Sequence, residues 1–354
     1  METIIRGNRS MHKPLIEKQC DVAIILPAYN EEKTIKATIV AFHSALPHAR
    51  IYVINNNSSD KTEAIAKATL AELRCSGDVL NEARRGKGNA LRRAFMSIDA
   101  DIYLLADADL TYPADRAVDL IYPIIESGAD MVVGDRHSCG HYSYENKRPL
   151  HNFGNRLIQI MINKFFSANL VDIMSGYRAF SRRFVKTYPI LVEGFQIETD
   201  MTLHALHHRF RIVEVPIEYR DRPAGSFSKL STLSDGTKVI FTIAQILRFH
   251  RPLLFFGWLG IVFALAGLFA GTPVIDDWIR HHYIYHVPLA ILASALEVIA
   301  LMLVGIGLIL DSLAHQQRLQ YEMYLLDYAN REDMTARGIS SSSLLSARYH
   351  SDVV

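Results

Sequence analysis

Residues 102–113 read IYLLADADLTYP, and the organisation of the whole chain can be worked out from this stretch. Its first five residues are apolar and rich in strand formers, whereas Asp107 and Asp109 place two carboxylates directly after them. Extended residues two apart point to the same side, so we expect these carboxylates to converge in front of a buried strand. A lone Asp-x-Asp also occurs on solvated turns, so the surrounding sequence has to decide between a binding site and a solvated turn.

Similar apolar runs recur along the chain, at residues 22–26, 51–54, 78–80 and 131–134. The first four runs, counting 102–106 as the fourth, are each followed by a polar loop and a stretch of helical periodicity. This pattern predicts βα units and a mostly parallel sheet. Ligands of such sheets bind at the carboxyl ends of the strands, where the loops PAYNEE, NNNSSDKT, NEARRGKG and DADLTYP lie.

These loops suggest a site for a metal and a nucleotide. Carboxylate oxygens with room left for water and phosphate suit Mg²⁺ or Mn²⁺ bridging a diphosphate. The loop around Lys87 offers glycines, cations and a helix N-terminus, which favour phosphate. It is not a Walker loop because Gly88 follows Lys87, and a solvated basic turn is the alternative. Asp60 or Ser58 can either bond a nucleotide or cap the next helix.

Residues 135–230 are less regular, and we assign them to the acceptor side of the same domain. Arginine forks bind phosphate in bidentate fashion, which makes this cationic region a candidate phosphate site. Sequence spacing does not bring the cations together, so ordinary surface charge is the alternative. The candidates are Arg136, Arg148, Arg178, Arg222 and Lys229, with Ser175 beside them.

Two long apolar runs, residues 252–275 and 287–310, follow the α/β part. Each has the ~20-residue length of a transmembrane helix. Buried core helices are the alternative, but soluble helices seldom stay apolar all round for so long. We expect Glu297 to face a helix neighbour or an oligomer interface, because an acid in the bilayer is costly. Gly305 and Gly307 would suit helix packing, including packing in a homo-oligomer.

The flanking charges predict that both termini are cytoplasmic. Cations precede the first run and follow the second, whereas the connecting loop sets Arg280 against Asp276 and Asp277. Residues 234–251 are expected to form a juxtamembrane amphipathic helix in the headgroup layer. Residues 311–354 are expected to form a cytoplasmic tail that begins as a polar helix. The flanking cations are Lys238, Arg248, Arg251, Arg318 and Arg331.

Composition narrows the function further. The 38 Lys and Arg residues balance 37 Asp and Glu residues, so no overall field indicates a nucleic-acid-binding protein. Cys20, Cys75 and Cys139 are too few and too scattered for a disulfide framework, which fits a reducing compartment. Residues 1–20 lack the apolar stretch of a secretory signal, so we treat them as an N-terminal extension.

Taken in order, the motifs resemble those of the family 2 inverting glycosyltransferases of GT-A fold, and more narrowly of the polyprenyl-phosphate (dolichol-phosphate-type) sugar transferases. The resemblance rests on PAYNEE, NNNSSDKT, the GKG loop, DADLTYP, GDR, SGYRAF, QIETD and DRPAGSFSKL, between Asp21 and Leu230. It implies an α/β GT-A domain, Rossmann-like with a mostly parallel sheet, over residues 21–233. A membrane-anchoring helical hairpin would follow, as in the membrane-anchored branch of that group.

Together with the local pattern, the resemblance implies three groups of site residues. Asp107 and Asp109 would hold the metal. The nucleotide site would comprise Pro27, Ala28, Tyr29, Glu31, Asn56, Asp60, Lys87 and Ala108. The acceptor-phosphate site would comprise Arg136, Arg148, Ser175, Arg178, Arg222 and Lys229. Direct catalytic roles would fall to Asp107, Asp109, Arg136, Arg148 and Arg222.

Two positions depart from the pattern of the family. Asn55 stands where many relatives carry an aspartate that meets the base or ribose, which leaves the choice of nucleotide open. Thr111 stands where some relatives place a glutamine near the metal. A third protein ligand is therefore not expected.

The resulting hypothesis is a single displacement with inversion, in which a polyprenyl phosphate attacks a nucleotide-diphosphate sugar at the cytoplasmic membrane face. A phosphate is already ionised near neutrality, so it needs orientation rather than a general base. A family 2 enzyme acting on a glycan or glycolipid hydroxyl would need a base, for which Glu198 and Asp200 are candidates; their alternative role is structural. A nucleotide-sugar-binding scaffold and a nucleotidyltransferase are weaker alternatives.

Overall fold

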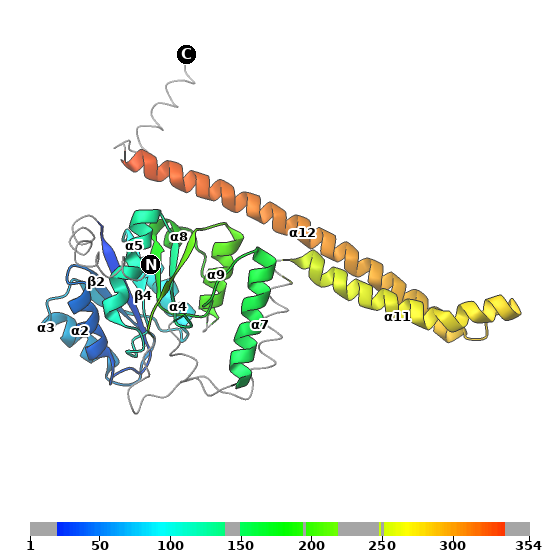
Figure 1. Cartoon of the computed structure of the whole chain (residues 1–354), viewed down its shortest axis with the longest axis horizontal. Helices are drawn as coiled ribbons and strands as arrows, with labels where there is room; N and C mark the ends of the chain where they lie inside the picture. Colours follow the sequence, from blue (N-terminus) through cyan, green and yellow to red (C-terminus); the bar gives the residue numbers. More distant parts are fainter. Residues whose placement is uncertain (1–19, 139–148, 194–195, 219–247, 249–250, 337–354) are drawn as a thin grey trace, which may run out of the picture. The chain divides into compact units, whose positions relative to one another are not determined.

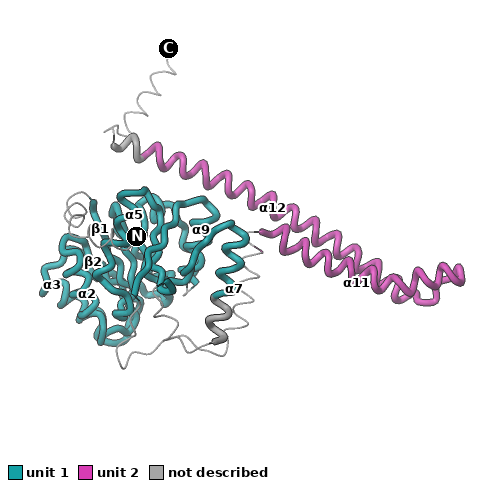
Figure 2. The backbone as a smooth tube through the Cα atoms, viewed as in Figure 1, with its two compact units in different colours: residues 1–236 teal, residues 237–354 magenta. Residues whose placement is uncertain are grey.

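The computed structural model describes residues 20–138, 149–193, 196–218, 248 and 251–336. The chain forms two compact units, residues 1–236 and 237–354 (Figure 2). The first contains the predicted α/β domain and the second the two apolar helices.

A seven-stranded sheet forms the centre of the first unit (Figure 1). Its strand order is β3-β2-β1-β4-β6-β5-β7. Among the described strands β6 alone runs against its neighbours, whereas every other pairing is parallel. The prediction of a mostly parallel α/β sheet is therefore confirmed. The strands are β1 (Val22–Ala28), β2 (Arg50–Asn55), β3 (Gly77–Asn81), β4 (Ile102–Leu105), β5 (Met131–Asp135), β6 (Arg178–Ser181) and β7 (Ile212–Pro216).

Strands β1 to β5 lie where the apolar runs predict them, but β6 and β7 fall in the region that we expected to be irregular. β6 has four residues and begins with Arg178, and β7 contains Glu214 and ends at Pro216. Neither therefore reads as an apolar run. Both are identified as strands by their pairing with β4 and β5, which is a tertiary contact.

Helices cover both faces of the sheet because successive strand residues point to opposite sides. Val22, Ile24 and Leu26 of β1 belong to one core cluster that also contains buried residues of α2, α3 and α5. On the other face, Phe95 of α4 meets Tyr103 and Phe180 edge to face. The helices and the 3-10 turn of this unit are α2 (Ile35–Ala45), α3 (Thr62–Glu72), α4 (Lys87–Ser97), η1 (Ala114–Arg116), α5 (Ala117–Ser127), α7 (Pro149–Phe166), α8 (Arg182–Thr187) and α9 (Ile197–His207).

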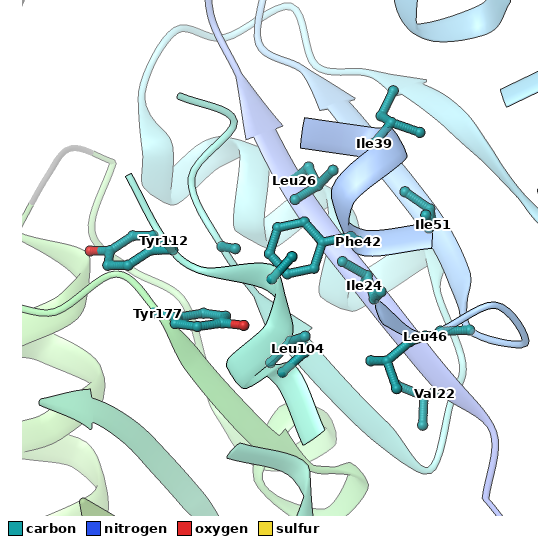
Figure 3. Packing of buried hydrophobic residues seen from close by; sticks show 14 of the residues in the cluster. Val22, Ile24, Leu26, Ile39, Phe42, Leu46, Ile51, Leu104, Tyr112 and Tyr177 are labelled. Carbon is teal, nitrogen blue, oxygen red and sulfur yellow. The ribbon is translucent and has the colours of Figure 1, made fainter. Parts of the chain in front are cut away.

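The first core cluster reaches the DADLTYP loop through three aromatic rings (Figure 3). Phe42 of α2 meets Tyr177 edge to face, with 6.2 Å between ring centroids, and Tyr177 stacks on Tyr112 at 5.1 Å. The Tyr177 hydroxyl donates a hydrogen bond to the carbonyl of Pro113 at 3.1 Å. The loop that carries the two aspartates is thus anchored in the hydrophobic core.

The second unit consists of α11 (Pro252–His281) and α12 (Val287–Ala336). Both helices are long and apolar enough to cross a membrane. Only 11% and 6% of their most apolar windows are buried, which argues against core helices of a soluble domain. The predicted runs 252–275 and 287–310 lie inside them, and α12 continues unbroken into the predicted polar helix of the tail.

Glycines allow α11 and α12 to approach each other closely. A Cβ atom on Gly267 would lie 2.8 Å from Oε1 of Glu297, so this acid faces the neighbouring helix, one of the two expected environments. Gly307 lies against Phe256, as helix packing predicts, whereas a Cβ on Gly305 would meet no described atom within 4 Å.

Candidate active site

The candidate site lies at the carboxyl edge of the parallel strands. Ala28, Asn55 and Asn81 are in register at the ends of β1, β2 and β3, and Ala106 follows the end of β4. The loops after the first two strands are joined by side-chain bonds: Asn30 N–H donates to Ser58 Oγ at 3.0 Å, and Glu31 N–H to Thr62 Oγ1 at 2.8 Å. The polar segments that follow the apolar runs therefore assemble at one edge.

The two aspartates do not both lie on extended backbone, because Asp107 lies just beyond β4 whereas Asp109 lies in a turn. β4 ends at Leu105, and the chain turns at Ala108 and Asp109 before Leu110 adopts a left-handed φ of 64°. The expectation that strand geometry aligns both carboxylates is wrong in this detail. Asp109 is almost fully buried, and its Oδ1 accepts hydrogen bonds from the hydroxyl of Thr111 at 2.5 Å and from its N–H at 3.2 Å. Thr111 thus fixes the orientation of Asp109.

Lys87 connects Asp107 to a second carboxylate. Its Nζ lies 2.5 Å from Oδ1 of Asp107 and 2.6 Å from Oε1 of Glu198 in the first turn of α9. The side chains of Lys87 and Glu198 are each 8% exposed, and that of Asp107 is 30% exposed. Burial opposes the ammonium charge, but the carboxylates of Asp107 and Glu198 outweigh it and raise the pKa of Lys87. The lysine therefore stays charged, with an excess of negative charge around it.

Gly176 leaves space in front of Asp107. A Cβ atom at this position would lie 2.9 Å from Lys87 Nζ, 3.0 Å from Asp107 Oδ2 and 3.3 Å from the hydroxyl of Tyr112. The same hydroxyl accepts a 2.9 Å hydrogen bond from Gly176 N–H, which holds the glycine in place. The missing side chain keeps the second oxygen of Asp107 accessible.

These groups fit a divalent metal. Within the residues that the structure describes, no three His, Cys, Asp or Glu side chains form a metal cage, so the described part of the chain offers a pair of aspartates at most. Hard carboxylate ligands with open positions suit Mg²⁺ or Mn²⁺ completed by phosphate and water. The open space beside Asp107 meets that requirement.

The glycines of the GKG loop have another role than the predicted approach to phosphate. A Cβ on Gly86 would lie 2.1 Å from the carbonyl oxygen of Glu193, and one on Gly88 would lie 1.8 Å from that of Val192. Gly88 N–H donates to Glu193 O at 3.0 Å. The glycines therefore admit the backbone of residues 192–193.

Asn56 binds the GKG loop instead of standing free for a nucleotide. Its Nδ2 donates to the carbonyl of Arg84 and its Oδ1 accepts from Gly86 N–H, both at 2.7 Å. Arg85 places its guanidinium 5.4 Å from the centroid of the Tyr29 ring. Asn56 and the aromatic contact shape the wall of the candidate nucleotide site.

The other nucleotide-site candidates mostly support the loops. Asp60 Oδ1 accepts a 3.0 Å bond from the N–H of Thr62, the first residue of α3, so it does serve the helix end. Burial raises the pKa of Asp60, but hydrogen bonds from Thr62 and Glu32 outweigh it and lower the pKa. The Ala108 carbonyl accepts a bond from Thr38 Oγ1 at 3.1 Å. Pro27 pairs with Ile54 within the sheet.

Asn55, at the position of the expected acid, takes part in a network of side chains. Its Nδ2 donates to Oδ1 of Asn81 at 2.9 Å and to Oε2 of Glu63 at 3.3 Å, and Asn81 donates to the other oxygen of Glu63 at 3.0 Å. Glu63 thus brings a carboxylate close to the position where Asn55 lacks one.

On the acceptor side, Arg136 forms a bidentate ion pair with Asp172. Its Nε and one terminal nitrogen lie 2.7 Å and 2.9 Å from the two carboxylate oxygens, and its backbone N–H donates to the same group at 3.1 Å. Burial raises the pKa of Asp172, but Arg136 outweighs it and holds that pKa below its usual range. Glu214 of β7 accepts the N–H groups of Val171 and Asp172, which fixes the loop carrying the carboxylate.

Arg178 is fully buried and bonded within the fold. Its guanidinium donates to the carbonyls of Ser175 and Ile173 at 2.8 Å and 2.6 Å, and to Oγ1 of Thr202 at 2.9 Å. Ser175 is also fully buried. In this arrangement Arg178 holds the loop that carries Gly176 and does not face an acceptor.

The remaining predicted residues divide into two groups. Arg148, Arg222 and Lys229 lie outside the described residues, as do Cys139 and most of the predicted juxtamembrane helix. Of the two candidate bases, Glu198 pairs with Lys87, and Asp200 accepts a 2.5 Å bond from the hydroxyl of Tyr188. Glu198 therefore has a structural partner in Lys87, and its carboxylate also acts on the charge of the Arg178 guanidinium, in line with the structural alternative.

Sequence reasoning missed three contributors, Gly176, Tyr112 and Asp172. The first two lie in motifs, SGYRAF and DADLTYP, that signalled the site without giving each residue a role. Asp172 precedes SGYRAF in a segment with no chemical signature. Only its contact with Arg136, 36 residues earlier, shows its importance.

Comparison with known proteins gives consistent results. The family model described as glycosyl transferase family 2 matches residues 23–188. Glycosyltransferase AglJ of Haloferax volcanii is 30% identical over 305 residues, covering 84% of this chain and 95% of that protein. The undecaprenyl-phosphate mannosyltransferase of Micrococcus luteus is 28% identical over 228 residues, covering 62% and 91%.

A solved structure shares the architecture of the first unit. Glucosyl-3-phosphoglycerate synthase of Mycobacterium tuberculosis, in complex with Mn²⁺, UDP-glucose and phosphoglyceric acid, aligns with a TM-score of 0.52. The match covers 67% of this chain and 82% of that one at 21% identity. At this level of identity the likeness shows the fold alone.

Proposed function

Since the chain belongs to glycosyl transferase family 2 and has the GT-A fold, we propose that it transfers a hexose-type sugar from a nucleotide-diphosphate donor to a polyprenyl phosphate. The observation that carries this proposal is the charged centre of Lys87, Asp107 and Glu198 at the carboxyl edge of the sheet. It places a cation for a diphosphate next to Asp107, one of the two proposed metal ligands. The relative from Micrococcus luteus, which is named for an undecaprenyl-phosphate acceptor, supports the lipid phosphate.

Asp107 and Asp109 would hold Mg²⁺ or Mn²⁺, which would offset the negative charge that develops on the departing nucleotide diphosphate. Lys87 would place its ammonium on the diphosphate, and Arg136 would orient the acceptor phosphate beside the sugar. An ionised phosphate needs no proton removed before it attacks, so a single displacement with inversion, in which the nucleotide diphosphate leaves, would need no general base. Both candidate bases are already bonded to other side chains, which supports this route.

The apolar helices would anchor the enzyme in the membrane. We place the catalytic unit and both termini on the cytoplasmic side, because cations flank α11 and α12 outside the connecting loop. In that loop region Arg280 is paired with Asp276 at 2.8 Å, which leaves little net positive charge there.

The test uses the purified full chain in detergent with Mn²⁺, a panel of nucleotide sugars and, in separate reactions, a polyprenyl phosphate or a glycolipid as acceptor. We expect one donor to release its nucleotide diphosphate and to yield a labelled sugar lipid in the organic extract. Release of pyrophosphate would indicate a nucleotidyltransferase, and donor binding without any product would indicate a scaffold. Transfer to a glycolipid hydroxyl but not to lipid phosphate would contradict the proposed acceptor.

A further inference from the structure

Lys87 and the expected metal compete for the same side chain. The ammonium lies 2.5 Å from Oδ1 of Asp107, one of the two proposed metal ligands. Two cations on one carboxylate repel each other, and the repulsion is strong in a buried place where water screens little. Such a site needs a second group that binds the Lys87 ammonium while Asp107 coordinates the metal.

Glu198 is placed to be that group. Its Oε1 lies 2.6 Å from Lys87 Nζ, and both side chains are 8% exposed. Lys87 is the first residue of α4 and Glu198 lies in the first turn of α9, so rigid backbone positions both partners. Gly176 leaves space beside the ammonium and Asp107 Oδ2, so a diphosphate and a metal have access from that side.

We propose that Glu198 is a positioning residue that holds the Lys87 ammonium at the donor site and so keeps Asp107 available to the divalent metal. The inference rests on the proposed metal site and assigns Glu198 a role different from that of a general base. Lys87 contacts two carboxylates, those of Asp107 and Glu198. When Glu198 is replaced, the lysine stays bound to Asp107. The metal must then displace the lysine.

The test measures Mn²⁺ binding to the purified full chain by electron paramagnetic resonance of free Mn²⁺, without donor or acceptor. In Glu198→Gln we expect the Kd for Mn²⁺ to rise about 10-fold or more, the scale seen when outer partners of metal ligands are removed. In the double variant Lys87→Gln/Glu198→Gln we expect the affinity to return to the wild-type value, because the competing cation is gone. Asp200→Asn is the matched control, since Asp200 lies on the same helix but bonds Tyr188, and it should bind Mn²⁺ like the wild type.

The double variant also separates positioning from misfolding. If Glu198→Gln weakened binding by disturbing the fold, a second substitution would not restore it. Wild-type affinity in Glu198→Gln, or equally weak binding in the single and the double variant, would overturn the inference. Absence of specific Mn²⁺ binding in the wild type would instead contradict the metal site of the proposed function, so the two failures are distinguishable.

Discussion

The catalytic unit contains two buried ion-paired centres that differ in how their charges balance. At the Lys87 centre one ammonium faces the carboxylates of Asp107 and Glu198. At the Arg136 centre one guanidinium and the backbone N–H groups of Arg136 and Met174 face the single carboxylate of Asp172. The first has negative charge to spare and is suited to a further cation, whereas the second balances one cation with one carboxylate, which holds Arg136 in place on the acceptor side.

The largest effect is expected from Asp107→Asn. This change removes a proposed metal ligand and half of the negative charge around Lys87, but its side chain is 30% exposed, so the fold should persist. Loss of several kcal/mol of transition-state stabilisation corresponds to a fall of about 10³-fold in the transfer rate. Label transfer from the nucleotide sugar to extracted polyprenyl lipid measures it.

The control for this variant is Asp101→Asn. Asp101 precedes β4 at the opposite edge of the sheet, where its carboxylate accepts the N–H of Asp21 at 2.9 Å. The transfer rate of the Asp101→Asn variant should match that of the wild type. An Asp107→Asn enzyme that retained a third of the wild-type rate would contradict the assignment of the donor centre.

For stability we expect the reverse order: a substitution at the Arg136 centre should destabilise the fold more than one at the Lys87 centre. Asp172→Asn leaves the guanidinium of Arg136 buried beside a neutral group, and removing one partner of a buried pair costs about 3–5 kcal/mol. Glu198→Gln leaves Lys87 with Asp107, so we expect a loss of about 1.5–3 kcal/mol, as for one hydrogen bond to a charged group. Thermal unfolding of the full chain in detergent compares them. Equal shifts in Tm would show that charge balance does not distinguish the centres.

Two glycine substitutions, with smaller expected effects, again compare a loss of activity with a loss of stability. Gly176→Ala would push a methyl group against Lys87 Nζ and Asp107 Oδ2, so we expect donor-dependent transfer to fall about 10-fold, a loss of about 1.4 kcal/mol. Gly134→Ala on β5 would meet Cδ1 of the buried Ile217 at 2.8 Å and the carbonyl oxygen of Tyr177 at 3.3 Å. That variant should lose about 1 kcal/mol of stability, in the range of mild core overpacking. Rate and Tm measured on both variants test the contrast, and a slower Gly134→Ala enzyme with unchanged Gly176→Ala would reverse it.

The sequence predicts the donor side of this molecule better than the acceptor side, for a physical reason. Strands β1, β2 and β4 are largely buried and read as apolar runs, β3 is a partly exposed edge strand with a short apolar run, and the loops after all four carry recognisable polar motifs. β6 and β7 contain Arg178 and Glu214, charges whose hydrogen-bond partners lie outside their own strands, some of them far along the chain. Such strands have no local signature.

The candidate site also combines residues that sequence motifs predict with contacts that only the folded chain reveals. Lys87, Asp107 and Asp109 could be chosen from motifs, but the bridge from Lys87 to Glu198 joins residues more than one hundred positions apart. The role of the glycines in the GKG loop was misread because loop composition predicts small residues without showing what fills the space. That space is filled by the backbone of residues 192–193, which no pattern connects to the loop.

A third ion pair joins Glu82 to Arg84 in the GKG loop. It tests whether charge balance or burial determines how much such a pair contributes to stability, and we expect its substitution to give the smallest loss of stability. Like the Arg136 centre it pairs one cation with one carboxylate, but the side chain of Arg84 is 56% exposed. Hydrogen bonds from Arg84 lower the pKa of Glu82 to about 2, from an ordinary value of 4.5. Because the folded-state pKa is depressed, the pair stabilises the fold above about pH 4.5, and this contribution is lost as the pH falls from there toward 2. Screening by water limits it to about 0.5–1 kcal/mol.

Glu82→Gln should therefore lower Tm slightly at pH 7 and remove part of the decline of Tm below pH 4.5, measured by thermal unfolding of the full chain across that pH range. Lys67→Gln is a suitable control, since its pair with Glu63 lies on the surface of α3 and should leave the acid decline attributed to Glu82 intact. If Glu82→Gln destabilised the protein as much as Asp172→Asn, a one-to-one charge balance alone would determine the stability of these pairs. The much smaller loss that we expect instead assigns the difference to burial, because an exposed arginine that loses its carboxylate is solvated whereas Arg136 is not.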